Sequence, residues 1–433
     1  MKRHRLLVWL ASLAMAGGLL SFAAGQSLTL VGWAYAPDYA KALLQQFTQE
    51  YGIQATFDGL PSGATYSQLL ATKFLSREPI DVLYLEDFSL TPFIASGWLK
   101  PLKDFAPPGA IAALEQQMTP SFVSAWTVNG ELYALPYYQT VWLPVYNKDM
   151  FAKAGITAFP DTWAGLKEAA LKIKQAGILD YPITLPIANT WTDKYQLFSM
   201  VYSQGGRMFD DQLNPLFDQP NSAFRTALNW LLDGIYTSKF INPKSLETNE
   251  ADNWRAFADG QAAISMIPGY RAAQIFDSSV SKVTDAAALA LTPGTTHDTV
   301  AWSRGYVVGA YENAQDSQIW DLIDFLGGKG KDGTYPGRRG WMQNYFLDSG
   351  YSFIWNDPGV HQALTQRFGD NVEVIRKQPA ASRSLPQAPW MASWVLNSEQ
   401  EINRALTREI SVDQAVKNLA SSWATDRQRF PGY

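Results

Sequence analysis

The chain has 433 residues, of which 47% are hydrophobic and 17% charged, so it is not intrinsically disordered and is long enough for roughly two or three domains. It has no cysteine, which excludes disulfides, thiolate nucleophiles, zinc ribbons and iron–sulfur clusters, and its three histidines are too few for a histidine-rich metal centre. A formal charge of −5 argues against binding of nucleic acid, whereas the aromatic content of 13% is high.

The first 25 residues have the order of a secretory signal peptide. A basic segment ends at Arg5, an apolar stretch runs from Leu6 to Leu20, and small residues follow as far as Gly25. Two glycines interrupt the apolar stretch, which is shorter than the roughly 20 residues of a membrane span, so cleavage near Gly25 is favoured over an anchor. The prediction is an exported, periplasmic protein that is not a lipoprotein, because lipid attachment requires a cysteine.

Strand and helix patterns alternate after this segment. Residues 28–33, 54–57 and 81–85 are predicted strands, with one helix from Pro37 to a stop at Gly52 and another over 65–75. This order predicts right-handed crossovers and a largely parallel, doubly wound α/β sheet. Ligands of such sheets bind beyond the carboxyl ends of the strands, which here are residues 33–35, 59–63 and 86–87.

The rest of the chain continues the α/β pattern without an internal repeat or a long linker. Residues 131–136 and 140–146 are predicted to be extended. The pattern therefore favours two lobes joined by several crossing strands. Helices are predicted at 162–176, 192–204, 221–237, 250–259, 315–326, 360–368, 392–407 and 411–427.

Several segments together resemble a known family. The most specific are Asn129–Pro136, Val145–Gly155 and Phe159–Trp163. Their order and spacing resemble the carbohydrate-type extracellular solute-binding proteins of ABC importers, the maltose-binding-protein-like group. Further matching segments are Pro79–Val82, Phe93–Leu102, Phe257–Met266, Gly333–Arg338 and the helical pair at 392–427.

The resemblance implies a fold, a function and partners. The fold is the two-lobe periplasmic-binding-protein (type II) fold, each lobe a doubly wound mixed sheet, with a ligand cleft between the lobes that closes by a hinge. The implied function is capture of a sugar or short oligosaccharide for the permease subunits of an ABC importer, by a monomer without cofactor, metal or catalytic residues. Matching order places lobe one at 27–137 plus 286–333 and lobe two at 138–285 plus 334–433.

The strand ends of lobe one supply the first candidate ligand contacts. Trp33 and Tyr35 lie at the end of the first strand, where an indole can stack on the C–H face of a sugar or simply be core. Asp87 follows the third strand, where it can accept sugar hydroxyls or cap a helix, and Glu86 beside it is interpreted as surface. Ser62, Gly63 and Tyr66 lie where a helix N-terminus faces the cleft.

The crossings between the lobes supply the second group. Arg304 is the most informative, because a guanidinium is a rigid donor fork for adjacent hydroxyls or a carboxylate. Trp191 in lobe two is either a stacking platform or packing under a loop. Tyr270 follows Pro268-Gly269 where the family commonly has Gly-Pro-Trp. The remaining candidates are Tyr137, Tyr138, Gln139, Gly269, Trp302, Gly305, Tyr306 and Arg338.

Two alternative functions stay open at this stage. A secreted glycoside hydrolase would also be acidic and aromatic-rich, but it needs two carboxylates about 5–9 Å apart, and Asp87 has no second acid on another strand end at the cleft. There is also no nucleophile elbow. The other alternative is a two-lobe binder of a non-sugar solute, which would require several cleft acids for a polyamine or several bases for a phosphate ester.

Overall fold

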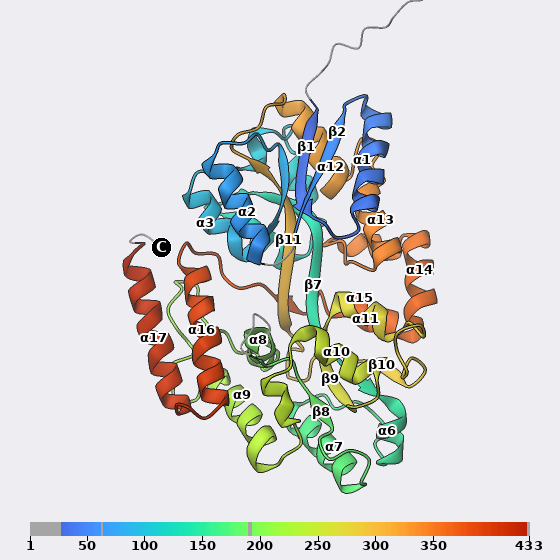
Figure 1. Ribbon diagram of the computed structural model, residues 1–433, viewed down its shortest axis with the longest axis vertical. Helices are drawn as coiled ribbons and strands as arrows, with labels where there is room; N and C mark the ends of the chain where they lie inside the picture. The colour runs from blue at the N-terminus through green and yellow to red at the C-terminus, as the bar shows by residue number, and fades with distance from the viewer. Residues whose placement is uncertain (1–26, 62–63, 189–192, 431–433) are drawn as a thin grey trace, which may run out of the picture.

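The computed structural model describes residues 27–61, 64–188 and 193–430. Figure 1 shows two lobes joined by two long strands, β7 (Ala134–Asn147) and β11 (Thr299–Gly309), which run from one lobe into the other. The predicted signal peptide and the predicted contacts Ser62, Gly63 and Trp191 lie outside the described residues.

The first lobe is built on the three N-terminal strands. β1 (Leu28–Trp33) pairs in parallel with β2 (Ala55–Leu60) on one side and β3 (Val82–Glu86) on the other, and β3 pairs antiparallel with β11. The crossover helices are α1 (Pro37–Tyr51) and α2 (Ala64–Leu75). The predicted alternation of strands and helices is therefore confirmed, and it brings the ends of β1 and β3 to one edge of the sheet.

Short elements complete the first lobe and lead into β7. They are η1 (Asp87–Ser89), α3 (Leu90–Ala95), β4 (Leu99–Lys100), η2 (Leu102–Asp104), α4 (Ala110–Glu115), α5 (Pro120–Trp126) and the hairpin of β5 (Thr127–Val128) and β6 (Glu131–Leu132). A later helix, α12 (Asp316–Gly327), also packs on this lobe, against α1 and β11.

The second lobe is built around the far end of β7. There β7 pairs antiparallel with β9 (Ile264–Pro268) and β10 (Ala287–Leu289), and β8 (Ile183–Thr184) pairs with β9 in parallel. One sheet thus continues through both lobes in the order β2-β1-β3-β11-β7-β9-β8. The helical elements of the second lobe are α6 (Lys148–Lys153), α7 (Trp163–Gln175), α8 (Asp193–Ser203), α9 (Ala223–Leu232), η3 (Asp233–Thr237), η4 (Pro243–Leu246), α10 (Glu250–Ala258) and α11 (Gly269–Ile275).

The C-terminal part of the chain visits both lobes. α13 (Pro336–Tyr345) packs on α12, and its Trp341 and Met342 belong to the same apolar cluster as β1 and β3. β12 (Ser382–Arg383) then pairs with β11, and α16 (Met391–Leu406) and α17 (Val412–Gln428) form a helical pair on the second lobe (Figure 1). The elements between α13 and β12 in the sequence are η5 (Ser352–Asn356), α14 (Pro358–Phe368), η6 (Gly369–Asn371) and α15 (Val372–Lys377).

The predicted helices agree with these bounds to within about two residues, with the helix predicted at 221–237 divided into α9 and η3. The exact division of the chain between the two lobes stays a prediction. Within the part of the chain that the structure describes, no helix combines the length and the apolar character that a membrane span requires.

The pairing of β7 with β11 contains one irregularity, at the crossing between the lobes. Arg304 pairs with Tyr138, but the next residue, Gly305, pairs with Pro136, so Tyr137 has no opposite residue. An extra residue on one strand is a β-bulge, which turns neighbouring side chains away from the regular alternation. Gly305 is required here because a Cβ would lie 2.5 Å from the Ala134 Cβ. The bulge therefore sets the direction of the side chains at the crossing.

Candidate functional site

A column of four stacked side chains connects the lobes next to this bulge. The Arg304 guanidinium lies between two indoles, with its Cζ 3.8 Å from the ring centroid of Trp33 and 4.3 Å from that of Trp302. Trp302 in turn stacks on Tyr195 of α8, with centroids 6.1 Å apart and planes 6° apart. All four side chains are buried. The column therefore joins β1 of the first lobe to α8 of the second.

The two indoles are held in place from behind by other rings. Trp33 meets Tyr66 edge-on, at a centroid distance of 5.7 Å, and the Tyr66 hydroxyl donates to the Tyr84 carbonyl at 2.8 Å. Trp302 meets Tyr270 of α11 edge-on at 6.1 Å. Each indole thus presents one face to Arg304 and is oriented by its own lobe.

The polar atoms of Arg304 are engaged by the first lobe. One terminal nitrogen, Nη2, forms an ion pair with Glu86, which lies directly opposite Arg304 in the pairing of β3 with β11. The other, Nη1, donates to the Tyr138 hydroxyl, while Nε is buried without a partner. Burial lowers the pKa of Arg304, and the Glu86 charge acts in the opposite direction. One nitrogen of the guanidinium, Nε, therefore has no hydrogen-bond partner beside the two indoles.

Asp87 binds the neighbouring position of β11. Its Oδ2 accepts hydrogen bonds from the Ser303 backbone nitrogen at 2.7 Å and from the Ser303 hydroxyl at 3.0 Å, and Trp126 donates to the same hydroxyl at 2.9 Å. Burial raises the pKa of Asp87 to about 7, against the effect of the two hydrogen bonds. Asp87 is the first residue of η1 rather than a helix cap, so the capping interpretation does not describe it.

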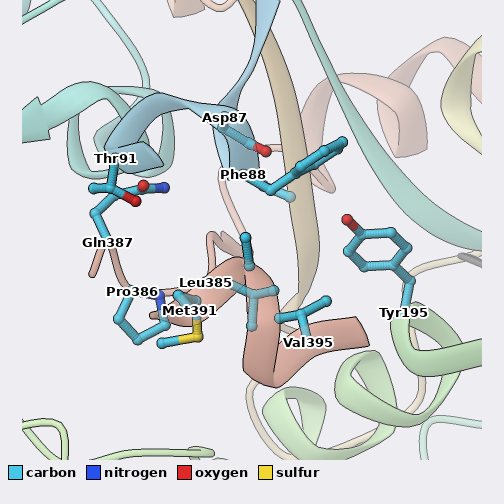
Figure 2. Close-up of a pocket in the computed structure, with 11 residues that line it drawn as sticks. Asp87, Phe88, Thr91, Tyr195, Leu385, Pro386, Gln387, Met391 and Val395 are labelled. Carbon is cyan, nitrogen blue, oxygen red and sulfur yellow. The ribbon is translucent and has the colours of Figure 1, made fainter. Parts of the chain in front are cut away.

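A small cavity lies between the lobes next to Asp87. Its volume is about 20 Å³, and Figure 2 shows the Tyr195 hydroxyl directed from the second lobe toward Phe88 and Asp87 of the first. A cavity of this size holds about one water molecule. A sugar at this place therefore requires the lobes to separate. The other lining residues are Thr91, Ala301, Leu385, Pro386, Gln387, Met391, Ala392 and Val395.

A second paired guanidinium lies on α11 beside Tyr270. Arg271 makes a bidentate ion pair with Glu250 of α10, at 2.6 Å from Nε to Oε1 and 3.0 Å from Nη2 to Oε2. Its charge reaches Tyr35 of the first lobe: burial raises the pKa of Tyr35, and Arg271 partly offsets that rise. Tyr35 is 46% exposed and stacks on Trp341 at 6.3 Å, so its contact with a ligand stays a prediction.

The structure brings seven of the predicted contacts to the column or its immediate neighbours, and Gly269 begins α11 next to Tyr270. Their role in binding stays a prediction. The seven are Trp33, Tyr66, Asp87, Tyr138, Tyr270, Trp302 and Arg304.

Other predicted contacts have partners inside the first lobe. Arg338 is fully buried; its Nε donates to the Leu326 carbonyl at 2.9 Å and its Nη2 to the Tyr306 hydroxyl at 3.3 Å. Tyr137 is fully buried and stacks on Tyr84 with centroids 4.3 Å apart. These contacts give all three predicted residues a structural function, and a direct contact with ligand stays a prediction for them.

Gln139 also points away from the column. Its Oε1 accepts from the Thr119 hydroxyl at 2.5 Å and its Nε2 donates to the Ser121 hydroxyl at 2.6 Å. Ser121 continues to Ser382 of β12 at 3.1 Å. This polar chain fastens β7 to the segment that leads into α16.

Glu86 and Tyr195 are two residues of the site that were not predicted as ligand contacts from the sequence. Glu86 was interpreted as surface, because its partner Arg304 is 218 positions away in the sequence and their register is not visible in a single chain. Tyr195 lies in the first turn of a predicted helix, a position whose direction depends on how α8 is placed. No group of three or more potential metal ligands occurs among the residues that the structure describes.

Comparisons with known proteins agree with this architecture. A family model described as bacterial extracellular solute-binding protein matches residues 33–332. The mannitol-binding protein of Pseudomonas aeruginosa is 24% identical over 367 residues, covering 81% of this chain and 80% of that protein. The sn-glycerol-3-phosphate-binding periplasmic protein UgpB of Rhizobium meliloti is 28% identical over 176 residues, covering 38% of this chain and 40% of that protein.

A solved structure adds the fold. The maltose-bound MalE3 protein of T. maritima superposes with a TM-score of 0.76 at 21% identity, covering 92% of this chain and 99% of that chain. At this identity the likeness establishes the fold alone, and it confirms the predicted two-lobe α/β architecture.

Proposed function

Because the chain belongs to the bacterial extracellular solute-binding protein family, we propose that it captures an uncharged sugar or sugar alcohol between its lobes for an ABC importer. In this proposal it is a monomer in the periplasm, exported by a signal peptide that is cleaved near Gly25. It hands its ligand, chemically intact, to permease subunits in the membrane. The residue contacts at the column carry the proposal.

The single observation behind the ligand class is the pair of indoles Trp33 and Trp302 with the Arg304 guanidinium between them, an arrangement called the slot below. Sugars present flat C–H faces that stack on aromatic rings, and a stacking contact contributes about 0.5–1.5 kcal/mol beyond area burial. Their hydroxyls require planar or charged partners, and Arg304 is bound here to Glu86 and Tyr138. Aromatic rings and partners for the hydroxyls therefore occur together.

The mode of capture follows from where the walls come from. Trp33 belongs to the first lobe, whereas Trp302 is held by Tyr195 and Tyr270 of the second. A ligand that touches both walls binds the closed arrangement better than an open one, and this difference in affinity shifts the population toward closure. The crossing strands β7 and β11 are the proposed hinge.

Binding is favoured over hydrolysis by the arrangement of the carboxyl groups. Glu86 and Asp87 are adjacent at the end of one strand, and their partners Arg304 and Ser303 are adjacent on β11. A glycoside hydrolase instead places its two carboxyl groups on either side of the scissile bond. The curated relatives are also named as binding proteins.

A panel of uncharged ligands tests this function. D-mannitol, ribitol, D-glucose and maltose are titrated calorimetrically, the melting temperature is followed, and the ligand is recovered and analysed. At least one member should bind saturably and raise the melting temperature by mass action, and it should be recovered unchanged. Failure of every uncharged member to bind, or turnover of a saccharide, contradicts the proposal.

A matched pair of variants locates the site. Trp302→Ala should abolish binding of the sugar found in the panel, because it removes one wall of the slot. Trp423→Ala serves as the control, since Trp423 lies on α17 and donates to the Leu213 carbonyl at 2.9 Å. Equal loss of binding in both variants places the site elsewhere.

A further inference from the structure

We infer that Glu86 is a specificity-determining residue: by holding the Arg304 guanidinium, it makes the cleft select uncharged ligands over phosphate esters and carboxylates. The inference rests on the proposed function and names the charge of its substrate class. Nothing in the sequence singled out Glu86, and its position in the structure supports the inference in four ways.

First, Arg304 without Glu86 would be an anion site. A guanidinium stacked between rings and buried at 7% exposure is a rigid fork of donors, the geometry that binds phosphate and carboxylate groups in pairs of parallel hydrogen bonds. In the structure, Nη2 faces the Glu86 carboxylate and Nη1 donates to the Tyr138 hydroxyl. Each of the two terminal nitrogens that would bind an anion therefore already has a partner, and the carboxylate offsets the positive charge.

Second, the pairing does not depend on the position of the lobes. Glu86 and Arg304 face each other across adjacent strands, β3 and β11, and Tyr138 is the partner of Arg304 on the other side, in β7. All three strands belong to one sheet at the first lobe. When the second lobe moves away to admit a ligand, the carboxylate moves with the guanidinium, so the charge stays compensated in the open arrangement.

Third, the other cations near the cleft are compensated in the same way. Arg271 is held by Glu250 in a bidentate pair, and Lys194 at the start of α8 is ion-paired with Glu399 of α16. Arg338 has no carboxylate partner, but it is fully buried in the first lobe and hydrogen-bonded to Leu326 and Tyr306. No uncompensated cation among the described residues reaches the slot.

Fourth, the residue that follows Glu86 in the sequence is also an acid. Asp87 binds Ser303, and burial raises its pKa to about 7. Protonated, it adds no charge, and ionised, it adds a negative charge. In neither form does it supply a positive charge for an anion, whereas a hydroxyl can donate to Glu86 or accept from the Nε of Arg304 without bringing a charge into a buried place.

The test uses matched ligands that differ by one phosphate. D-mannitol is compared with D-mannitol 1-phosphate, and D-glucose with D-glucose 6-phosphate, by calorimetry on the intact protein. The wild-type protein should bind the uncharged member of a pair at least about 100-fold more tightly, which corresponds to about 2.7 kcal/mol. Equal or tighter binding of the phosphate ester overturns the inference without any variant.

The decisive variant is Glu86→Gln, which keeps the shape and removes the charge. It should narrow the preference for the uncharged ligand by at least about tenfold, mainly by gaining affinity for the phosphate ester. The matched control is Glu131→Gln, because Glu131 pairs with Lys103 at the surface and its loss should leave the preference unchanged. A preference that is unchanged in Glu86→Gln overturns the inference and leaves the proposed function intact.

A double variant tests whether Arg304 is the group that Glu86 controls. Glu86→Gln with Arg304→Met removes both charges, so no guanidinium is left buried and unpaired. This protein should not gain affinity for the phosphate esters, because the donor fork is gone. A gain equal to that of Glu86→Gln would show that Arg304 is not the group that Glu86 controls. If the wild-type protein binds neither D-mannitol nor D-glucose, nor any other uncharged ligand of the panel, the inference and the proposed function are both overturned.

Discussion

Two buried arginines, Arg304 on β11 and Arg338 on α13, have much in common. Each guanidinium lies near aromatic rings, Arg304 against Trp33 and Trp302, and Arg338 5.9 Å from the Tyr137 centroid. Both were candidate ligand contacts in the sequence. They differ in their polar partners: Arg304 is paired with a carboxylate, whereas Arg338 donates to a carbonyl and a tyrosine hydroxyl. Each has one buried guanidinium nitrogen without a partner, Nε in Arg304 and Nη1 in Arg338.

The difference shows what separates a binding group from a structural one in this fold. Burial and aromatic contacts occur in both cases, so neither identifies a ligand contact. The lobe from which the contacts come distinguishes the two arginines. Rings held by both lobes surround Arg304, whereas the partners of Arg338 all belong to the first lobe. A group between the lobes changes its surroundings when they move, and a group inside one lobe does not.

The largest expected effect is at Trp33, which packs inside the first lobe and also contacts Arg304. Its edge packs on Tyr66 and Tyr84 of the first lobe, and its face covers Arg304. Trp33→Ala should therefore lower the free energy of unfolding by about 3–5 kcal/mol and also weaken ligand binding. Chemical denaturation and calorimetry on the same preparation measure both. Trp33→Phe, which keeps a ring, is the control and should show a smaller loss of each; full stability with full affinity in Trp33→Ala would contradict the account.

The second prediction separates the two arginines directly. Arg338→Ala removes packing and two hydrogen bonds inside one lobe, so it should lower the free energy of unfolding by about 2–4 kcal/mol and leave the affinity of the folded protein nearly unchanged. Arg304→Ala should instead reduce affinity for the sugar at least about tenfold. Denaturation curves and titrations of both variants decide the matter. Loss of ligand binding in a fully folded Arg338→Ala protein would contradict the purely structural role of Arg338.

How far the sequence leads depends on whether a feature is local. Helices such as α7, α16 and α17 follow from apolar periodicity and caps, and the order of β1, α1 and β2 follows from alternating patterns. The strand ends also indicated Trp33 and Asp87. The pairing of Glu86 with Arg304 did not emerge, because it depends on the register of β3 with β11. The inward direction of Tyr137 depends equally on a bulge that no local signal marks.

The third prediction compares two glycines that were both predicted to contact the ligand. A Cβ at Gly305 would lie 2.5 Å from the Ala134 Cβ, whereas a Cβ at Gly269 would meet the Thr140 hydroxyl at 3.4 Å, an ordinary contact. Gly305→Ala should therefore destabilise the protein by about 1–3 kcal/mol and Gly269→Ala by under about 0.5 kcal/mol. Melting and denaturation curves measure the two values. Equal stability of the two variants would show that the bulge tolerates a side chain.

The fourth prediction concerns pH and a carboxyl group away from the slot. Burial raises the pKa of Asp348 to about 7 in the folded protein, above the ordinary value of 3.8 that applies to the unfolded chain. The native state therefore binds more protons between those values, and the free energy of unfolding falls as pH rises from about 4 to about 7. Asp348→Asn should flatten the dependence of melting temperature on pH across this window. A slope as steep as that of the wild-type protein would assign the effect to another group, such as Asp87.

The central claim is that a ligand is held by contacts from both lobes. Small-angle X-ray scattering tests this claim most directly, with the protein measured in the presence and absence of the sugar that binds most tightly in the panel. The column of Trp33, Arg304, Trp302 and Tyr195 must part to admit a ligand and close around it afterwards. The account predicts a smaller radius of gyration at saturating ligand than without it. An unchanged radius at saturation, with binding confirmed in the same sample, would contradict capture between the lobes.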